Sequence, residues 1–408
     1  MSAPAVEQYA EQARAWLEAN AEPRPPSRDL RWGEGSDQVA LFRDLSPAEE
    51  EAQVEQLRAW QRRKFDAGYG AIAWPVEHGG AGLPRAHELA FRRLETSFLT
   101  PAINEAVSIS LEIVAPTILT LGSDEQRARW IGPLRRGDAM ACQMFSEPGA
   151  GSDLGAIALR AEEEGGEWVL DGQKVWTSGA HLCDVAYVIA CTARGVAKRE
   201  AFTAFLVPLD APGITVRPIR QMTGGANFNE VFFDGVRVPD GARMGEVGSG
   251  WKAMMTTLGF ERAAAARGGG GTGPDLFGRL VLLARHSGRG ADANVRQAVA
   301  GLYVSNRVRS WTARRAAANS RARGVPGPEG SISKLALTNA LQDTGAVASL
   351  LLGPSLVADT GGWGTFAWSE FVCGVPGLRI GGGTDEIQRN TIAERVLGLP
   401  REPEEVAK

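Results

Sequence analysis

The spacing of apolar residues changes twice along this chain of 408 residues. Before about residue 138, apolar side chains recur at three- and four-residue intervals, as in amphipathic helices. From Met140, short apolar runs alternate with Gly, Pro and Asp, which is typical of strands. After Gly248-Ser249-Gly250 the helical spacing returns and continues to the end. The sequence therefore predicts an α+β fold with three domains, over residues 1–138, 139–240 and 241–408.

Local signals place the individual elements. Ser46-Pro47 and Ser123-Asp124-Glu125 are typical helix starts. Asp171-Gly172 between two apolar runs predicts a β-hairpin with a type I′ turn. The expected helices cover residues 6–19, 46–65, 85–97, 104–122, 124–136, 274–286, 291–321, 331–352 and 384–398. The expected strands cover residues 167–170, 173–176, 185–191, 202–207, 214–219 and 231–238.

Composition excludes several classes of protein. The chain is 44% hydrophobic and 23% charged, as in ordinary globular proteins, and its net charge of −4 argues against a nucleic-acid binder. No apolar run is long enough to span a membrane, and the first twenty residues do not resemble a signal peptide, so we expect a cytoplasmic protein with no membrane partner. The four Cys and four His lack metal-ligand spacing, and we expect no metal site.

The residues Phe145–Asp153 read F-S-E-P-G-A-G-S-D and lie where helical spacing gives way to strands. Gly149 and Gly151 allow the backbone to approach a ligand closely, and the hydroxyls of Ser146 and Ser152 can bind phosphate or a polar ring edge. This composition indicates a loop that holds an anion or a cofactor. A plain surface turn is the alternative.

Two further features could belong to a site. Trp176 and Ser178 end a predicted strand, where a Trp can cover the face of a flat ring and a hydroxyl can meet its edge, although a Trp in a sheet is usually core. Gly268, Gly270 and Gly273 match the spacing GxGxxG, but the run before them is helical. A dinucleotide site needs a strand there, so we expect a glycine-rich break between helices.

The apolar stripe Trp251, Met254, Met255 and Leu258 predicts a further helix, and the pair Glu261–Arg262 lies on an unusual face of it. At about 100° per residue, Glu261 lies about 20° from Met254, which belongs to the apolar stripe of that helix. A carboxylate on this face must be paired, protonated or functional. The pair could tie two helices together, but a general base with a positioning Arg is favoured because the stripe points toward a domain junction.

Several separated motifs together resemble the acyl-CoA dehydrogenase family, and the resemblance covers nearly the whole chain. The family has a helical domain, a β-sheet domain and a C-terminal four-helix-bundle domain, in the order expected here. The matching stretches are Met144–Asp153, which resembles the first signature; Lys174–Ser178, which resembles the flavin-edge strand; Gly383–Asn390, which resembles the second signature; and Trp74-Pro75 with Gly79-Gly80.

The resemblance implies an FAD enzyme that oxidises an acyl-CoA thioester between its α- and β-carbons. A base removes the α-proton, the β-hydride goes to flavin N5, and electrons pass to an electron-transfer flavoprotein. Ser178 is the implied partner of N5, and Trp176 faces the ring. The implied cofactor-binding residues are Met144, Phe145, Ser146, Gly151, Ser152, Trp176, Ser178, Thr384 and Glu386. The implied substrate-binding residues are Ser152, Arg262 and Gly382.

The chain departs from the family pattern at the base. Much of the family has a catalytic Glu two residues before the Thr of the second signature, where this chain has Gly382. Gly382 keeps a backbone N–H that could polarise the thioester carbonyl. A second branch of the family has its base directly before an Arg on the earlier helix, which corresponds to Glu261. Glu261 is therefore the expected base, and Asp385 and Glu386 are the nearest alternatives.

A second departure concerns the adenine end of FAD. The family's Arg-x-x-Phe-Gly is replaced by residues 284–288, and its Gln-x-x-Gly-Gly by Leu352-Gly353-Pro354. These changes resemble actinobacterial-type members, some of which pair with a paralogous subunit as α2β2. We expect either that assembly or a homodimer or homotetramer. A flavin oxidase or monooxygenase, and a non-catalytic subunit, are the alternative functions.

Overall fold

The computed structural model describes residues 5–24, 30–102, 104–268, 275–323 and 327–401. The chain divides into two compact units. The first comprises Met1–Pro26, Leu45–Gln221 and Ala226–Ala264, and the second comprises Ser27–Asp44, Met222–Gly225 and Ala265–Lys408. The N-terminal helices and the sheet therefore belong to one unit. The domain boundaries at residues 138 and 240 remain predictions.

The helices of the first unit begin where the capping signals predict. Ser46 and Ser123 each cap a helix in a capping box, with Glu49 and Gln126 as the returning side chains. A π-helical turn interrupts the expected helix 104–122 shortly before Pro116, which cannot donate a backbone hydrogen bond. The helical segments are α1 (Val6–Asn20), α2 (Pro47–Asp66), η1 (Val76–His78), α3 (Arg85–Glu95), α4 (Glu105–Ile109), η2 (Ser110–Val114), α5 (Ala115–Leu121), α6 (Asp124–Arg136) and α7 (Gly250–Gly268), which belongs to this unit up to Ala264.

A mixed sheet lies between α6 and α7 in the chain. Its hydrogen-bonded order is β6-β7-β3-β2-β4-β5-β8, and β1 pairs in parallel with β4. The strands are β1 (Ala141–Met144), β2 (Arg160–Glu164), β3 (Glu167–Ser178), β4 (Val185–Cys191), β5 (Phe202–Pro208), β6 (Ile214–Ile219), β7 (Phe228–Pro239) and β8 (Arg243–Met244). Short 3-10 turns lie between them at η3 (Leu154–Ala156), η4 (Ala180–Leu182) and η5 (Asp240–Ala242).

The predicted hairpin at Asp171-Gly172 is wrong. Both residues lie inside the continuous strand β3, and the chain reverses at Gly165-Gly166, between β2 and β3. The register of β3 with β7 shifts between Leu170 and Gly172, so the Asp-Gly pair marks a bulge. The Asp171 carboxylate accepts a hydrogen bond from the backbone N–H of Gly235 on β7.

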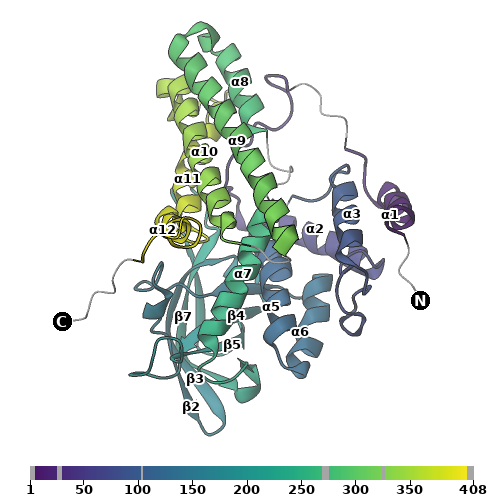
Figure 1. Ribbon diagram of the computed structural model, residues 1–408, viewed down its shortest axis with the longest axis vertical. Helices are drawn as coiled ribbons and strands as arrows, with labels where there is room; N and C mark the ends of the chain where they lie inside the picture. The colour runs from purple at the N-terminus through teal and green to yellow at the C-terminus, as the bar shows by residue number, and fades with distance from the viewer. Residues whose placement is uncertain (1–4, 25–29, 103, 269–274, 324–326, 402–408) are drawn as a thin grey trace, which may run out of the picture. The chain divides into compact units, whose positions relative to one another are not determined.

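Strand β4 is buried on both faces because it separates two cores. Val185, Tyr187 and Ile189 face one core together with side chains from α5, α6 and α7. The alternate residues Ala186 and Val188 face a second core formed by β3, β5 and β7. Figure 1 shows α7 crossing the sheet at β4 and β5. This packing fixes the axis of α7 relative to the sheet.

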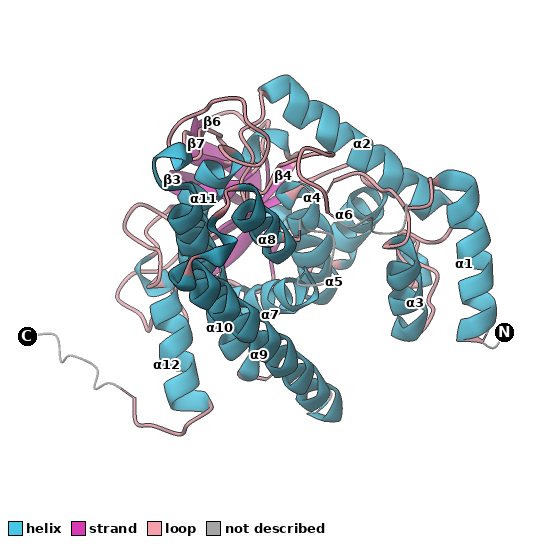
Figure 2. Ribbon diagram, turned by 90° about the horizontal axis from the view of Figure 1, so that it is seen from above, coloured by secondary structure: helices cyan, strands magenta, loops and turns pink. Residues whose placement is uncertain are grey.

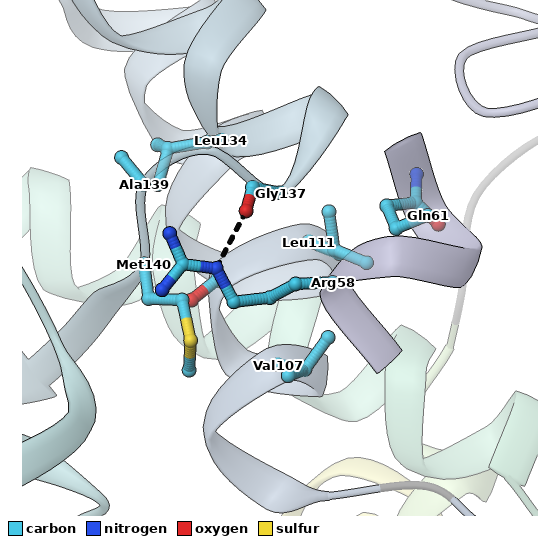
Figure 3. Close-up of a pocket in the computed structure, with 9 residues that line it drawn as sticks. Arg58, Gln61, Val107, Leu111, Leu134, Gly137, Ala139 and Met140 are labelled. Carbon is cyan, nitrogen blue, oxygen red and sulfur yellow. Dashed lines mark hydrogen bonds between the residues drawn. The ribbon is translucent and has the colours of Figure 1, made fainter. Parts of the chain in front are cut away.

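Helix α2 is fixed to the segment between α6 and β1. The Arg58 guanidinium donates a hydrogen bond to the carbonyl of Gly137 at 2.7 Å (Figure 3). It donates a second one to the carbonyl of Asp138, also at 2.7 Å. A small pocket lined by apolar side chains of η2 and of the α6–β1 segment lies beside Arg58. The pocket contains none of the predicted site residues. Its walls hold the helical segment that starts at Glu105 against the rest of the unit.

The second unit is a helical bundle formed by α8 (Leu276–His286), α9 (Ala293–Arg323), α10 (Glu329–Leu352), α11 (Ala367–Ile380) and α12 (Asp385–Arg395), with short turns η6 (Arg289–Ala291) and η7 (Gly353–Leu356). Helix α10 packs against α8, α9, α11 and α12, and Figure 2 shows α9 and α10 side by side. The sequence did not predict α11, because Gly374, Pro376 and Gly377 are poor helix formers. The glycines let Leu41 and Phe42 approach the helix closely.

Three sequence-based expectations concern stretches that the structure describes only in part. Gly270 and Gly273 of the GxGxxG match lie outside the described residues, and Gly268 ends α7. No helix within the described ranges is long and apolar enough to cross a membrane. The same ranges hold no cluster of three potential metal ligands among His, Cys, Asp and Glu side chains.

Candidate active site

The loop Phe145–Asp153 is anchored by one buried carboxylate. Glu147 accepts hydrogen bonds from Lys174 Nζ at 2.8 Å and from the backbone N–H groups of Ala158 at 2.7 Å and Leu159 at 2.9 Å. Lys174 is completely buried and also donates to the carbonyl of Phe145. Burial lowers the pKa of Lys174 to about 8, and the charge of Glu147 opposes this fall. The loop is therefore fixed to β3 by an enclosed ion pair.

The tip of the loop is exposed and its base is not. Backbone hydrogen bonds join Glu147 and Ala150 in both directions and close a tight turn. Gly151 and Ser152 are exposed, and a Cβ at Gly151 would meet no atom within 4 Å. Met144 and Phe145 are buried, so their side chains face the protein interior. Phe145 packs edge-on against Tyr187.

The end of β3 carries backbone strain and an exposed aromatic ring. Trp176 has a φ of 62° and is the one residue other than Gly with a positive φ among those described. Its side chain is 58% exposed, although it lies within a strand that pairs with β7. Its neighbour Thr177 is buried, and the Thr177 hydroxyl has no hydrogen-bond partner in the described chain. The backbone of Val175 donates to the Ser146 carbonyl at 2.9 Å, which joins this strand end to the loop.

A chain of buried hydroxyl groups sets the position of α7. Thr257 is completely buried, and its hydroxyl lies 3.2 Å from both the Thr117 hydroxyl on α5 and the Tyr187 hydroxyl on β4. Glu261 lies four residues further on, one turn along the same face of the helix. The helix is therefore fixed to α5 and β4 one turn before Glu261.

Glu261 is half-buried, whereas Arg262 lies at the exposed edge of the helix. The Glu261 carboxylate accepts a long hydrogen bond, 3.4 Å, from Gln143 Nε2 on β1. Burial raises the pKa of Glu261, and Gln143 and Arg262 oppose the rise. A carboxyl group with a raised pKa and weak internal pairing is suited to accept a proton from a bound ligand.

A second carboxyl group, Glu105, is near enough for the charge of Glu261 to act on it, and it was not predicted. It is the first residue of α4, and burial raises its pKa even though solvent reaches the residue. A hydrogen bond with Ser178 lowers this pKa, and the charge of Glu261 raises it further. Glu105 therefore links the end of β3 to α7. The sequence signal at Glu105, an acid after an Asn cap, is also typical of an ordinary helix start.

The residues predicted from the second signature belong to the second unit. Thr384 caps α12 by accepting a hydrogen bond from the backbone of Ile387 at 3.2 Å. Gly382 has a φ of 66°, and Glu386 is exposed and pairs with Arg389 at 3.1 Å. The roles of these three positions at the cofactor and substrate remain predictions.

Asp385 occupies a different environment from its neighbour Glu386. Its carboxylate is buried and contacts Arg379 at 2.7 Å, Thr338 at 2.8 Å and Lys334 at 3.3 Å. Burial would raise the pKa of Asp385, but these donors outweigh it and hold the pKa below its usual value. Asp385 thus joins α10, α11 and α12, as expected of a structural ion cluster.

Helix α8 ends where the chain departs from the family's adenine-binding pattern, and its last residue is a His that contacts another residue of the second unit. The ring of His286 stacks on Trp32 with centroids 4.0 Å apart and planes 11° from parallel. Both residues belong to the second unit. At this position the chain therefore has an aromatic packing contact.

The features of the first unit fit a flat, conjugated ligand such as flavin. Trp176 offers an exposed aromatic face, the half-buried Ser178 offers a hydroxyl, and Gly151 offers unobstructed backbone. The unpartnered hydroxyl of Thr177 lies between Trp176 and Ser178 in the chain. A strained aromatic residue beside an unsatisfied polar group is typical of a ligand site.

Comparisons with known proteins agree with this geometry. Family models match residues 4–138, 142–236 and 248–397, described as the acyl-CoA dehydrogenase N-terminal, middle and C-terminal domains. A protein of Mycobacterium tuberculosis named acyl-CoA dehydrogenase IpdE1 is 36% identical over 97% of this chain and 98% of its own length.

Two solved structures share the fold. One, described as Tcur3481-Tcur3483 steroid ACAD, has a TM-score of 0.72 at 24% identity and covers 98% of this chain and 99% of its own. The ChsE4-ChsE5 complex of Mycobacterium tuberculosis has a TM-score of 0.70 at 24% identity, over 98% of this chain and 99% of its own. The chain therefore belongs to the acyl-CoA dehydrogenase family and is an FAD-dependent oxidoreductase of lipid metabolism.

Proposed function

We propose that this enzyme oxidises an acyl-CoA thioester between its α- and β-carbons and that Glu261 is its base. The observation that carries the proposal is the environment of Glu261, which is half-buried, has a raised pKa and accepts one long hydrogen bond from Gln143. An ionised carboxylate in these surroundings gains by accepting a proton. Arg262, the next residue on the helix, is exposed and would contact the substrate's charged portion.

The remaining predicted residues divide between cofactor and substrate. Ser146, Trp176 and Ser178 would hold the flavin ring, with Met144 and Phe145 shaping its wall, and bound FAD would supply the acceptor for the β-hydride. Gly151 and Ser152 would meet the phosphate-bearing portions of the cofactor and substrate, because their backbone is exposed at a glycine-rich turn. Thr384 and Glu386 would approach FAD from the start of α12, and the Gly382 N–H would polarise the thioester carbonyl.

The proposal includes two partners. An electron-transfer flavoprotein would reoxidise the enzyme. A paralogous subunit in an α2β2 assembly is favoured over a homo-oligomer, because the adenine-binding pattern is replaced and the ChsE4-ChsE5 structure of the same fold is described as a complex. A steroid-derived thioester is our first choice of substrate, since a structure of this fold is described as a steroid ACAD. We infer a cytoplasmic location.

The test is anaerobic bleaching of the bound flavin by a panel of acyl-CoA thioesters that are short, branched, long or steroidal. Glu261→Gln should keep its flavin and lose bleaching by roughly 10²- to 10⁴-fold, the usual contribution of a general base. Glu246→Gln, an exposed acid before α7, is the matched control and should bleach normally. Normal turnover by Glu261→Gln would rule Glu261 out as the base.

Turnover in air and reconstitution with FAD separate the alternative functions. Rapid oxygen consumption with peroxide release in place of flavoprotein reduction would identify an oxidase or monooxygenase. A purified chain that stays colourless after reconstitution with FAD, both alone and with a paralogous partner, would identify a non-catalytic subunit. Because Glu261→Gln changes only the base, flavin content and bleaching report on separate parts of the proposal.

A further inference from the structure

Glu105 reaches the end of β3 because α4 packs directly on it. The Asn104 side chain caps α4 by accepting a hydrogen bond from the Ala106 backbone at 2.9 Å. A Cβ at Gly179 would lie 2.5 Å from the Cβ of Ala106, so only Gly lets the two segments approach this closely. Ser110 ties the following turn to β1, with its hydroxyl 2.8 Å from the Ala141 backbone N. Glu105 is therefore held beside Ser178, the residue before Gly179.

Two carboxyl groups consequently share one region of the first unit. The described groups that act on the pair come from three elements: Ser178 on β3 faces Glu105, Gln143 on β1 contacts Glu261, and Arg262 follows Glu261 on α7. Two carboxylates that interact lose their protons in separate steps, because the first charge opposes the second. Burial is the main cause that raises the pKa of Glu105, and the charge of Glu261 raises it further.

We propose that Glu105 is a positioning residue that directs the hydroxyl of Ser178 and whose ionisation is coupled to that of Glu261. Ser178 has a single O–H to donate. When Glu105 is ionised, its carboxylate accepts the hydrogen bond that the Ser178 hydroxyl donates. When Glu105 is protonated, its own O–H can donate to the Ser178 oxygen, and the Ser178 hydrogen becomes available to flavin N5. The inference rests on the proposed function, in which Ser178 meets N5 and Glu261 is the base.

Titration of the carboxyl groups tests the pair without flavin. The full chain, labelled with ¹³C at the Glu side-chain carboxyls, is titrated by NMR, and the two signals are assigned by their loss in Glu105→Gln and Glu261→Gln. In Glu261→Gln the ionisation of Glu105 should move to lower pH, because the neighbouring charge is gone. An unchanged Glu105 titration in that variant would overturn the proposal. Ser178→Ala keeps both charges and should preserve the two separate steps.

A flavin readout tests the direction of the Ser178 hydroxyl. The visible absorption of the flavin-loaded enzyme should change with pH in step with the ionisation of Glu105. Glu105→Gln should abolish that change, and Glu162→Gln, which removes one exposed charge from β2, should retain it. A pH-dependent spectrum that persists in Glu105→Gln would overturn the proposal. Loss of bleaching in Glu261→Gln together with either overturning result would leave the proposed function standing.

Discussion

Two glutamates of the first unit, Glu147 and Glu261, show how the same side chain serves different ends. Glu147 is buried and receives three strong donors: a Lys and two backbone N–H groups within 2.9 Å. Glu261 is half-buried, and its described hydrogen bond is a single contact of 3.4 Å. The first carboxylate is satisfied by the fold itself. The second is left with capacity for a ligand.

The difference teaches where to look for chemistry. A carboxylate whose partners are all internal stabilises one conformation of the chain, whereas a poorly paired one keeps a raised pKa and stays reactive. Motif membership does not separate the two, because Glu147 belongs to the first signature and Glu261 to none of the quoted motifs. Asp385 in the second unit shows the same: it belongs to the second signature, yet three internal donors bind its carboxylate.

The largest expected effect follows from breaking the enclosed pair. Lys174→Met leaves Glu147 buried without its counter-charge, which we expect to lower the free energy of unfolding by about 3–5 kcal/mol. Lys198→Met is the matched control, since it removes a Lys that pairs with Asp153 at 3.2 Å with both side chains about two-thirds exposed. That exposed pair should contribute less than about 1 kcal/mol. Urea denaturation of the flavin-free chain measures both, and equal losses would contradict the comparison.

A smaller effect is expected from the strain at Trp176. Gly adopts a positive φ freely, whereas Ala does not, so Trp176→Gly should be more stable than Trp176→Ala by about 1 kcal/mol. Both variants should bind FAD more weakly, because the exposed ring is lost. Trp168 on the same strand is the control: it is buried and donates to Asp240 at 2.8 Å, so Trp168→Phe should cost stability but leave FAD affinity in the folded protein unchanged. Fluorescence titration with FAD that finds tight binding in Trp176→Ala would contradict a flavin role.

The helices and most strands follow from local signals because their stabilising contacts are encoded within a few residues. The capping boxes at Ser46 and Ser123 set the starts of α2 and α6, and the run Val185–Cys191 is β4 itself. The failures have long-range causes. Asp171-Gly172 forms a bulge because β7 pairs across it, and α11 tolerates Pro376 and its glycines because Leu41 and Phe42 pack there.

The residues of the candidate site likewise divide into those with a local sequence signal and those placed by long-range contacts. The helical face of Glu261 could be predicted because it lies seven residues, about two helical turns, after Met254, which is fully buried. Glu105 could not, because its partner Ser178 lies on a strand far along the chain and nothing local distinguishes it from an ordinary first-turn acid. The strain at Trp176 was equally hidden, since a backbone angle depends on how β3 pairs with β7.

The smallest effect concerns Glu50, an acid whose pairing depends on pH. The ring of His181 lies with Nε2 at 2.9 Å from the Glu50 carboxylate and Nδ1 at 3.0 Å from the Asn229 side-chain oxygen. The hydrogen bond with Glu50 is the main cause that raises the pKa of His181 above its ordinary value.

A raised folded-state pKa means that His181 binds its proton more tightly in the folded chain than in the unfolded one. Its contribution to stability is therefore fully present below the unfolded value of about 6.5 and is lost as the pH rises through the folded value. Between pH 6 and pH 8 the parent should lose more stability than His181→Gln, and the two curves should become parallel at higher pH. His78→Gln, at η1, should follow the parent, and urea denaturation across this range makes the comparison. If the stability of His181→Gln changes with pH as steeply as that of the parent, the pairing of His181 with Glu50 contributes nothing to the pH dependence. Glu50 would then resemble Glu147, whose partners act through the fold alone.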